Sequence, residues 1–203
     1  ATTKLVYIVV ADAKIIGLDP SLRNWGVATG TYNAAKRIVT VDDLFVVQPV
    51  VPTGKQVRQS SKDLEAAFQL LEGVLPYANE VNAIFVEVPV GSQNARSMAS
   101  YGICIGILGA IRALGLTFFE VTPTEVKVTA VNSKTATKRQ MIDWATKAHP
   151  NAPWPTQVKK GVTSIIESKA EHMADAVGAI HAGIQTPAFQ QAVRFMEGAE
   201  ITH

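Results

Sequence analysis

Cysteine, long apolar runs and net charge are all scarce in this sequence of 203 residues. The one cysteine, Cys104, has no partner for an internal disulfide, so the fold does not depend on an oxidising compartment. The run between Arg96 and Arg112 holds 15 uncharged residues, short of the ~20 that span a bilayer. The first ten residues lack the pattern of a signal peptide. We therefore expect a cytoplasmic protein that makes no membrane contact.

The net charge of +2 is too small to indicate a nucleic-acid partner, but the basic residues are unevenly distributed. Residues 127–169 contain eight lysines and arginines against two acids, a net charge of +6 in one stretch. Clustered basic charge is typical of a surface that contacts phosphates. It is also typical of a solvated helix face, so both interpretations stand at this point.

The spacing of apolar residues and turns predicts five strands. The first three follow one another with short turns, which predicts an antiparallel meander over 15–19, 25–32 and 37–47. An apolar run with a single acid predicts a buried strand over 83–88, parallel to the first, and a further strand is predicted over 116–121. Residues 4–10 are interpreted as an extra edge strand or an ordered arm.

Helices are predicted between and after these strands. Over 55–75, apolar residues recur at spacings of three and four, which predicts an amphipathic helix closed by Pro76: Leu64, Ala67, Phe68, Leu71 and Leu75. The remaining helices are predicted over 94–114, from Pro123, over 135–147, over 168–184 and, as a short segment, after Pro187. This order predicts an α/β fold with a mixed five-stranded sheet in one domain.

Two of the predicted strands each carry one acid in an otherwise apolar run. Asp19 ends the first strand, before a turn and Gly26, and Glu87 lies near the end of the strand over 83–88. Ends of central strands are where sheet proteins often place functional side chains. Taken alone, Asp19 is as well explained by a turn that it bonds, and Glu87 by a pair with a lysine.

A third polar pair comes late in the chain. His172 and Asp175 are three residues apart among small and apolar neighbours, so they share one face of a helix that packs on the sheet. Buried acids are costly unless they are paired or bind a metal. Two carboxylates from neighbouring strands and a His/Asp face can converge on Mg²⁺ or Mn²⁺. Two such ions, ~4 Å apart, can hold a phosphodiester for attack by water.

Four stretches in this order resemble the RuvC-like Holliday-junction resolvases of the RNase H-like superfamily. The resemblance covers residues 15–182 and is carried by Ile-Ile-Gly-Leu-Asp-Pro-Ser at 15–21, the acidic strand over 83–87 followed by Asn94-Ala95, Thr-Pro-Thr-Glu-Val-Lys at 122–127, and His-Met-Ala-Asp-Ala at 172–176. It implies an RNase H-like fold with helices on both faces of the mixed five-stranded sheet. Residues 1–12 and 187–203 are then extensions of the domain.

The resemblance also implies the function. Asp19, Glu87, His172 and Asp175 would be the catalytic residues and hold Mg²⁺ or Mn²⁺, two ions per site, with His172 either a ligand or an aid to the attacking water. Basic positions of the family that contact DNA correspond to Lys127 and Lys138, and Lys134 and Arg139 would extend that surface. The family members are homodimers, and the helix over 94–114 with its small residues is the expected interface.

One position departs from the family pattern. Many members have an aromatic residue three positions after the glutamate, which stacks on an unpaired base, whereas this chain has Val90. Stacking on a base contributes ~1–3 kcal/mol, and valine cannot supply it. We therefore expect a cleavage-sequence preference that differs from the usual one.

The expected activity is hydrolysis of a four-way DNA junction by paired cuts that leave 5′-phosphate and 3′-hydroxyl ends. Two alternatives remain open. The protein can be a nuclease with relaxed specificity for other branched or flap DNA, or a junction-binding protein with little catalysis.

Overall fold

The computed structural model describes residues 12–54 and 56–199. The strand or arm that we predicted over 4–10 lies outside the described residues. Within them, no helix is both long enough and apolar enough to cross a membrane.

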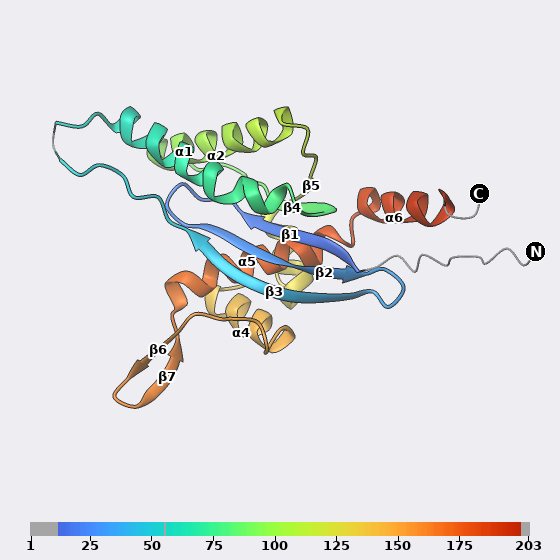
Figure 1. Cartoon of the computed structure of the whole chain (residues 1–203). Helices are drawn as coiled ribbons and strands as arrows, with labels where there is room; N and C mark the ends of the chain where they lie inside the picture. The colour runs from blue at the N-terminus through green and yellow to red at the C-terminus, as the bar shows by residue number, and fades with distance from the viewer. Residues whose placement is uncertain (1–11, 55, 200–203) are drawn as a thin grey trace, which may run out of the picture.

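The centre of the molecule is a five-stranded mixed sheet with the strand order β3-β2-β1-β4-β5 (Figure 1). The strands are β1 (Ala13–Asp19), β2 (Trp25–Asn33), β3 (Ile38–Val47), β4 (Ala83–Glu87) and β5 (Phe119–Val121). The first three form the predicted antiparallel meander, whereas β4 and β5 run parallel to β1. This arrangement confirms the predicted fold class.

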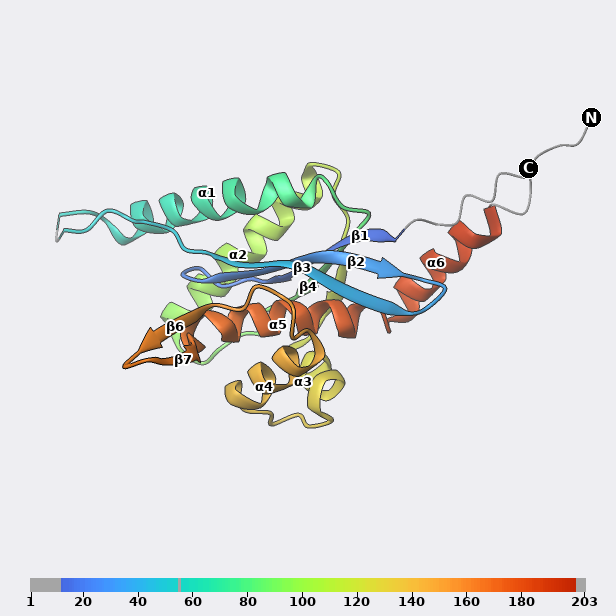
Figure 2. The same cartoon turned by 60° about the horizontal axis from the view of Figure 1, so that its bottom comes forward.

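Helices cover both faces of the sheet (Figure 2). One face carries α1 (Gln59–Ala78) and α2 (Ala95–Ala113), and the other carries α5 (Glu167–Gly183) with α3 (Pro123–Val131) and α4 (Lys138–Ala148) beneath it. Because the central strands are covered twice, their apolar side chains enter two separate cores. Ile16 and Leu18 of β1 contribute to the core under α1 and α2, and Ile15 contributes to the core under α5.

Helix α1 departs from the prediction in its end and in its buried face. It continues through Pro76 to Ala78, because Val74 and Ala78 are buried on the sheet and hold the last turn in place. The buried residues follow a second register of four-residue spacing, Ala66, Leu70, Val74 and Ala78. Two residues of the predicted apolar face instead point to solvent, with Leu64 74% and Phe68 59% exposed.

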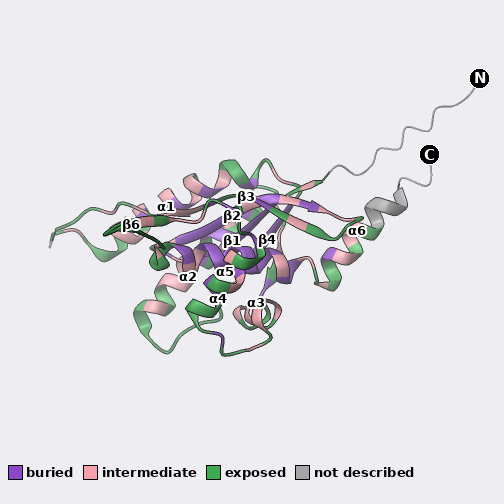
Figure 3. Ribbon diagram, turned by 90° about the horizontal axis from the view of Figure 1, so that it is seen from below, coloured by how far each residue is buried: buried purple, intermediate pink, exposed green. Residues whose placement is uncertain are grey.

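Helix α5 is the most enclosed helix of the molecule, and Figure 3 shows it and the sheet centre as buried. Small residues let it lie directly on the strands. A Cβ atom on Gly17 of β1 would collide with the backbone oxygen of Ala176, and one on Gly183 would collide with the ring of Phe85. Glycine at these positions therefore allows α5 to lie close to the sheet. This short distance determines how far the side chains of α5 lie from the strands.

The segment between α4 and α5 contains a hairpin that the sequence prediction missed. Strands β6 (Thr156–Lys159) and β7 (Val162–Ile165) pair in antiparallel register around a two-residue turn. Lys160 and Gly161 both have positive φ angles, as a type I′ turn requires. The hairpin projects from the body of the molecule, and its residues are largely exposed (Figures 1 and 3).

After α5, the chain forms α6 (Pro187–Ala199), which agrees with the helix predicted after Pro187. Phe189 at its start is buried against the rings of Tyr32, Phe85 and Phe119. The beginning of this predicted extension is therefore part of the core under α5.

Candidate active site

A cavity of about 250 Å³ opens at the carboxyl ends of β1 and β4. Asp19 is the last residue of β1 and Glu87 is the last residue of β4. The two strands are parallel neighbours with Leu18 opposite Val86, so both acids emerge at the same edge of the sheet and line this cavity. The carboxyl edge of parallel strands is where α/β proteins commonly bind ligands.

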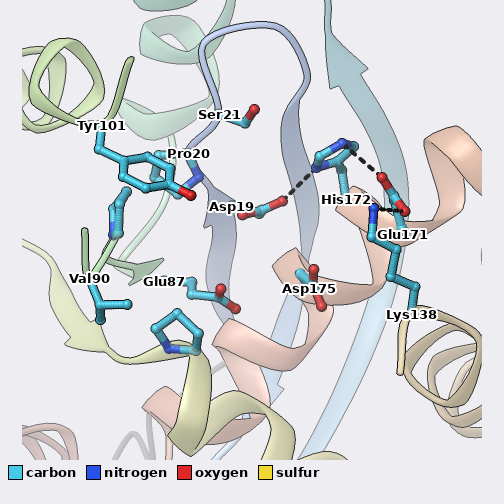
Figure 4. Close-up of a pocket in the computed structure, with 12 residues that line it drawn as sticks. Asp19, Pro20, Ser21, Glu87, Val90, Tyr101, Lys138, Glu171, His172 and Asp175 are labelled. Carbon is cyan, nitrogen blue, oxygen red and sulfur yellow. Dashed lines mark hydrogen bonds and ion pairs between the residues drawn. The ribbon is translucent and has the colours of Figure 1, made fainter. Parts of the chain in front are cut away.

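Helix α5 brings His172 and Asp175 to the same cavity (Figure 4). The approach depends on Gly26, which pairs with Asp19 across the sheet. A Cβ atom on Gly26 would collide with the backbone oxygen of His172, so a larger residue would push this turn of α5 away. With glycine in place, Nδ1 of His172 lies 2.8 Å from Oδ2 of Asp19 and forms a hydrogen bond with it.

Burial and neighbouring charges raise the pKa of all three carboxyl groups. Burial, followed by the charges of Asp19 and Asp175, raises the pKa of Glu87 to about 9. Burial, followed by the charge of Asp19, raises the pKa of Asp175 to about 7. The pKa of Asp19 is also raised, because its burial outweighs the hydrogen bond from His172. A cluster of this kind stores electrostatic repulsion that a bound cation would relieve.

His172 belongs to a chain of polar contacts that crosses from the sheet to α4. Burial disfavours its charged form, but the hydrogen bond to Asp19 and the neighbouring acids outweigh this and raise its pKa. Its Nε2 atom lies 3.4 Å from Oε1 of Glu171, whose Oε2 lies 2.8 Å from Nζ of Lys138. The imidazole is therefore oriented from both sides.

In the part of the chain that the structure describes, no group of three or more histidine, cysteine, aspartate or glutamate side chains is arranged as a finished metal site. Asp19 is engaged with His172, and the side chains of Glu87 and Asp175 form no hydrogen bond or ion pair with any described residue. The donor set itself, three carboxylates and an imidazole around one cavity, is of the kind that hard divalent cations accept.

Cys104 lies fully buried in the core beneath α2. Burial, together with the charge of Asp19, raises the pKa of its thiol to about 12. A thiol in this state is not a nucleophile at neutral pH, so Cys104 is a core residue.

Comparisons with protein-family models and with curated proteins find no match for this chain. Solved structures do match. RuvC of T. thermophilus in complex with a Holliday junction substrate aligns at 16% identity over 88% of this chain and 96% of that chain, with a TM-score of 0.57. A second Thermus thermophilus RuvC structure aligns at 18% identity over 89% and 96%, with a TM-score of 0.56. The yeast mitochondrial Holliday junction resolvase Ydc2 aligns at 12% identity over 95% and 91%, with a TM-score of 0.52.

The chain has the RuvC-like fold. The predicted resemblance is thereby confirmed at the level of the fold. Sequence identities of 12–18% show a shared fold and do not show a shared activity. What this RuvC-like chain does at its cavity has to be argued from its own residues.

Two residues of the cavity were not singled out from the sequence. Glu171 bridges His172 and Lys138, and Tyr101 of α2 is the one aromatic residue among the described residues that line the cavity. Figure 4 shows Tyr101 and Val90 on the same side of the cavity. The position of Glu171 directly before His172 is a signal that could have been used, whereas no sequence pattern links Tyr101 to Glu87.

The four predicted DNA-contacting residues lie in different settings on the RuvC-like fold. Lys138 lines the cavity, and Lys127 of α3 is close enough to lower the pKa of Glu87 and of Asp175. Lys134 is exposed between α3 and α4. Arg139 points away from the cavity lining and bonds both Asp143 and Glu167, the two acids of the basic stretch over 127–169. Arg139 is therefore the least available of the four.

Proposed function

We propose that this protein is a metal-dependent, structure-selective endonuclease that resolves four-way DNA junctions. The observation that carries the proposal is the convergence of Asp19, Glu87 and Asp175 on one cavity of a RuvC-like fold. The products would be paired nicks with 5′-phosphate and 3′-hydroxyl ends. One of the similar structures holds a Holliday junction substrate, which supports the choice of DNA.

The three carboxylates are the residues that would hold Mg²⁺ or Mn²⁺, two ions per site. Bound ions would polarise the scissile phosphate and lower the pKa of a water molecule. The protein contributes the position of the acids: two strand ends fix Asp19 and Glu87, and the contact of α5 with Gly26 fixes Asp175. The raised pKa values of Glu87 and Asp175 mean that cations compete with protons for these groups.

His172 and two lysines complete the chemistry. The Nδ1 atom of His172 is hydrogen-bonded to Asp19 and its Nε2 atom faces Glu171. The imidazole can therefore take up a proton close to the acids without a change of rotamer. It serves either as a further metal ligand or as the group that assists the attacking water. Lys127 and Lys138 would contact the phosphates that flank the cut, and their closeness to the acids supports this role.

We propose a homodimer through α2, so that two sites face the two strands that are cut. The exposed face of α2 supports this arrangement, since Cβ atoms on Gly102, Gly106 and Gly109 would meet nothing within 4 Å. Met98 and Ile105 on the same helix are each 46% exposed. A flat, uncharged helix face of this kind permits close approach of a second helix. Light scattering would show Ile105→Lys to be a monomer where the unmodified chain is a dimer.

The experiment that tests the function is cleavage of a synthetic four-way junction in Mg²⁺. Asp19→Asn and Glu87→Gln remove one charge each and should slow cleavage by about 10³-fold or more, because each group contributes several kcal/mol through the ions it holds. Glu80→Gln, at an exposed carboxylate beyond the end of α1, is the matched control. Junction binding should survive in all three variants. Cleavage by Asp19→Asn at the rate of the control would refute the proposal.

A junction-binding protein with little catalysis is the second candidate, since lysines near the cavity can contact phosphates without any cleavage. A time course with Mn²⁺ separates the two, because a binder gives no product. A panel of three-way, flap and linear DNA separates a resolvase from a nuclease with relaxed specificity, which would cut several of them at similar rates.

A further inference from the structure

The hairpin formed by β6 and β7 stands at the end of the molecule where β1 delivers Asp19 (Figures 1 and 2). Between the hairpin and the first turns of α4 and α5 lies a groove of about 750 Å³. Its lining includes Arg139 of α4, Gln157, Lys159 and Ser164 of the hairpin, and Ser168 of α5. Neither the sequence resemblance nor the acid cavity accounts for this groove.

The groove lies beside the acid cavity. Lys138 lines the cavity and its neighbour Arg139 lines the groove, so the first turn of α4 separates the two. On α5, Glu171 lines the cavity and Ser168, one turn earlier, lines the groove. A polymer that enters the cavity can therefore extend along the groove without leaving the protein surface.

The hairpin lines the groove mainly with polar side chains, namely Gln157, Lys159, Thr163 and Ser164. Side chains alternate along a strand, so Gln157 and Lys159 share one face, and the register places Ser164 and Val162 opposite them on that face. Lys159 and Lys160 are exposed and form no ion pair with any residue that the structure describes. The ten residues from 156 to 165 carry these two positive charges and no acid.

The acids near the groove are already engaged. Arg139 binds Glu167, which also lines the groove, at 2.6 Å and Asp143 at 2.9 Å, so its single positive charge offsets part of the charge of these two acids. Helix α5 also begins at the groove without a side-chain cap, so its first backbone N–H groups face the same space. Free ammonium groups, hydroxyl groups and a helix start together form a surface for consecutive phosphates.

We propose that this groove binds the sugar–phosphate backbone of one duplex arm of the branched substrate, with the hairpin lying along that arm. The proposal rests on the proposed function and names the part of the substrate that the hairpin holds. A two-stranded ribbon has the width to follow a duplex groove, and the exposed side chains of Val158 and Val162 sit beside the lysines at its tip. The hairpin would then position the arm whose strand enters the acid cavity.

A double variant tests the charges. Lys159→Ala removes one, and Lys160→Asn removes the other while keeping the turn, because Asn-Gly is the preferred pair for a type I′ turn. The matched control is Lys14→Ala with Lys36→Ala, two exposed lysines at the opposite end of the sheet. Fluorescence anisotropy with a labelled junction, in an Asp19→Asn background that prevents cleavage, gives affinity as a function of salt.

For the hairpin variant we expect about tenfold weaker binding near 0.15 M salt and a salt slope reduced by about 1.8, from two lost contacts at about 0.9 each. The control should bind within twofold of the parent. Equal salt slopes for the hairpin variant and the control would overturn the proposal, while the function would stand if the parent enzyme cuts the junction. A parent chain that neither binds nor cuts branched DNA would refute both.

A second measurement locates the arm. Cys104 is fully buried, so a cleaving reagent attached to Ser164→Cys would label the hairpin selectively. Because the proposed dimer carries two hairpins, the expected result is backbone cleavage confined to two symmetry-related duplex arms, several base pairs from the branch point. Cleavage spread equally over all arms, or none, would show that the groove holds no arm.

Discussion

Among the residues that the structure describes, two clusters of buried or half-buried titratable side chains are built in opposite ways. In the acid cavity, Asp19, Glu87 and Asp175 repel one another, and all three have raised pKa values. Between α4 and α5, His149 and His181 share a hydrogen bond of 2.8 Å between their Nε2 atoms. Each histidine of the pair has a hydrogen-bond partner, whereas Glu87 and Asp175 of the acid cluster have none among the described residues.

The surroundings explain the difference. The ring of Trp144 packs edge-on against His181, and the indole N–H of Trp154 donates to the backbone oxygen of His149. Such a pair stabilises the packing of two helices as long as both rings stay neutral. Like charges without partners do not stabilise a fold, so the acid cluster is explained by what it binds. Proteins commonly accept such strain at functional sites.

The largest expected effect comes from removing repulsion at the acid cluster. Asp175→Asn should lower junction cleavage by about 10³-fold while leaving the free energy of unfolding unchanged or higher, because it relieves the charges of its neighbours. Single-turnover cleavage and urea unfolding on the same preparation measure both. A loss of stability equal to that of a core mutation would show that Asp175 is a structural residue.

The next effect comes from the contact that assembles the cluster. Gly26→Ala places a methyl group against the backbone of His172, so α5 must shift. We expect cleavage to fall by about 10²-fold, as small displacements of catalytic groups do, with ~1–3 kcal/mol lost in stability. Glu80→Gln, at an exposed carboxylate beyond the end of α1, is the control for stability. Normal cleavage by Gly26→Ala would mean that α5 tolerates the shift.

The histidine pair should appear in the pH dependence of stability. Burial, followed by the neighbouring charge of His149, lowers the pKa of His181 to about 4, and burial lowers the pKa of His149. Because the native state binds fewer protons than the unfolded state, stability from this pair is present above pH 6.5 and is lost as the pH falls towards 4. The loss should be about 2–3 kcal/mol. Urea unfolding of His181→Gln between these pH values should show a flatter slope, and a slope equal to that of the unmodified chain would contradict the assignment.

The smallest expected effect is stabilisation by Mg²⁺, and it should have the opposite pH dependence. The raised pKa values of Asp175 and Glu87 mean that these groups favour the fold most at low pH, and that this stability is lost as the pH rises through about 7 and 9. A cation replaces the protons, so the rise in melting temperature with Mg²⁺ should be a few degrees at pH 8.5 and near zero at pH 5.5. Asp19→Asn is the control. An equal rise at both pH values would place the ion elsewhere.

The sequence was most informative where a residue type conflicts with its surroundings. Single acids in apolar strands, Asp19 and Glu87, mark a position that burial alone would not select, and both reach the cavity. The helix α1 was predicted, but two residues of its predicted apolar face are exposed, because two apolar registers overlap in that helix and only the sheet decides which one is buried. No count of apolar residues along one helix can make that choice.

The hairpin was missed for a different reason. Each of its strands has four residues and no buried face, so its periodicity carries no signal. Its turn is Lys160-Gly161, which is not among the dipeptides that mark hairpins most strongly. The contact between Glu171 and Lys138 depends on how α4 packs against α5, which sequence patterns leave open. The roles of Asp19, Glu87 and Asp175 remain predictions that the variants above test, and the role of His172 also remains a prediction.

The position of α5 late in the chain also has a consequence for folding during synthesis. This helix packs on β1, β2 and β4, which are made more than 80 residues before it emerges during synthesis. Until α5 arrives, one face of the sheet has no cover, and Asp19 and Glu87 have neither His172 nor Asp175 beside them. Contacts so distant in sequence form late and slowly. An unfinished chain therefore carries no complete set of site residues, and a nuclease site would come together only once the body of the protein has folded.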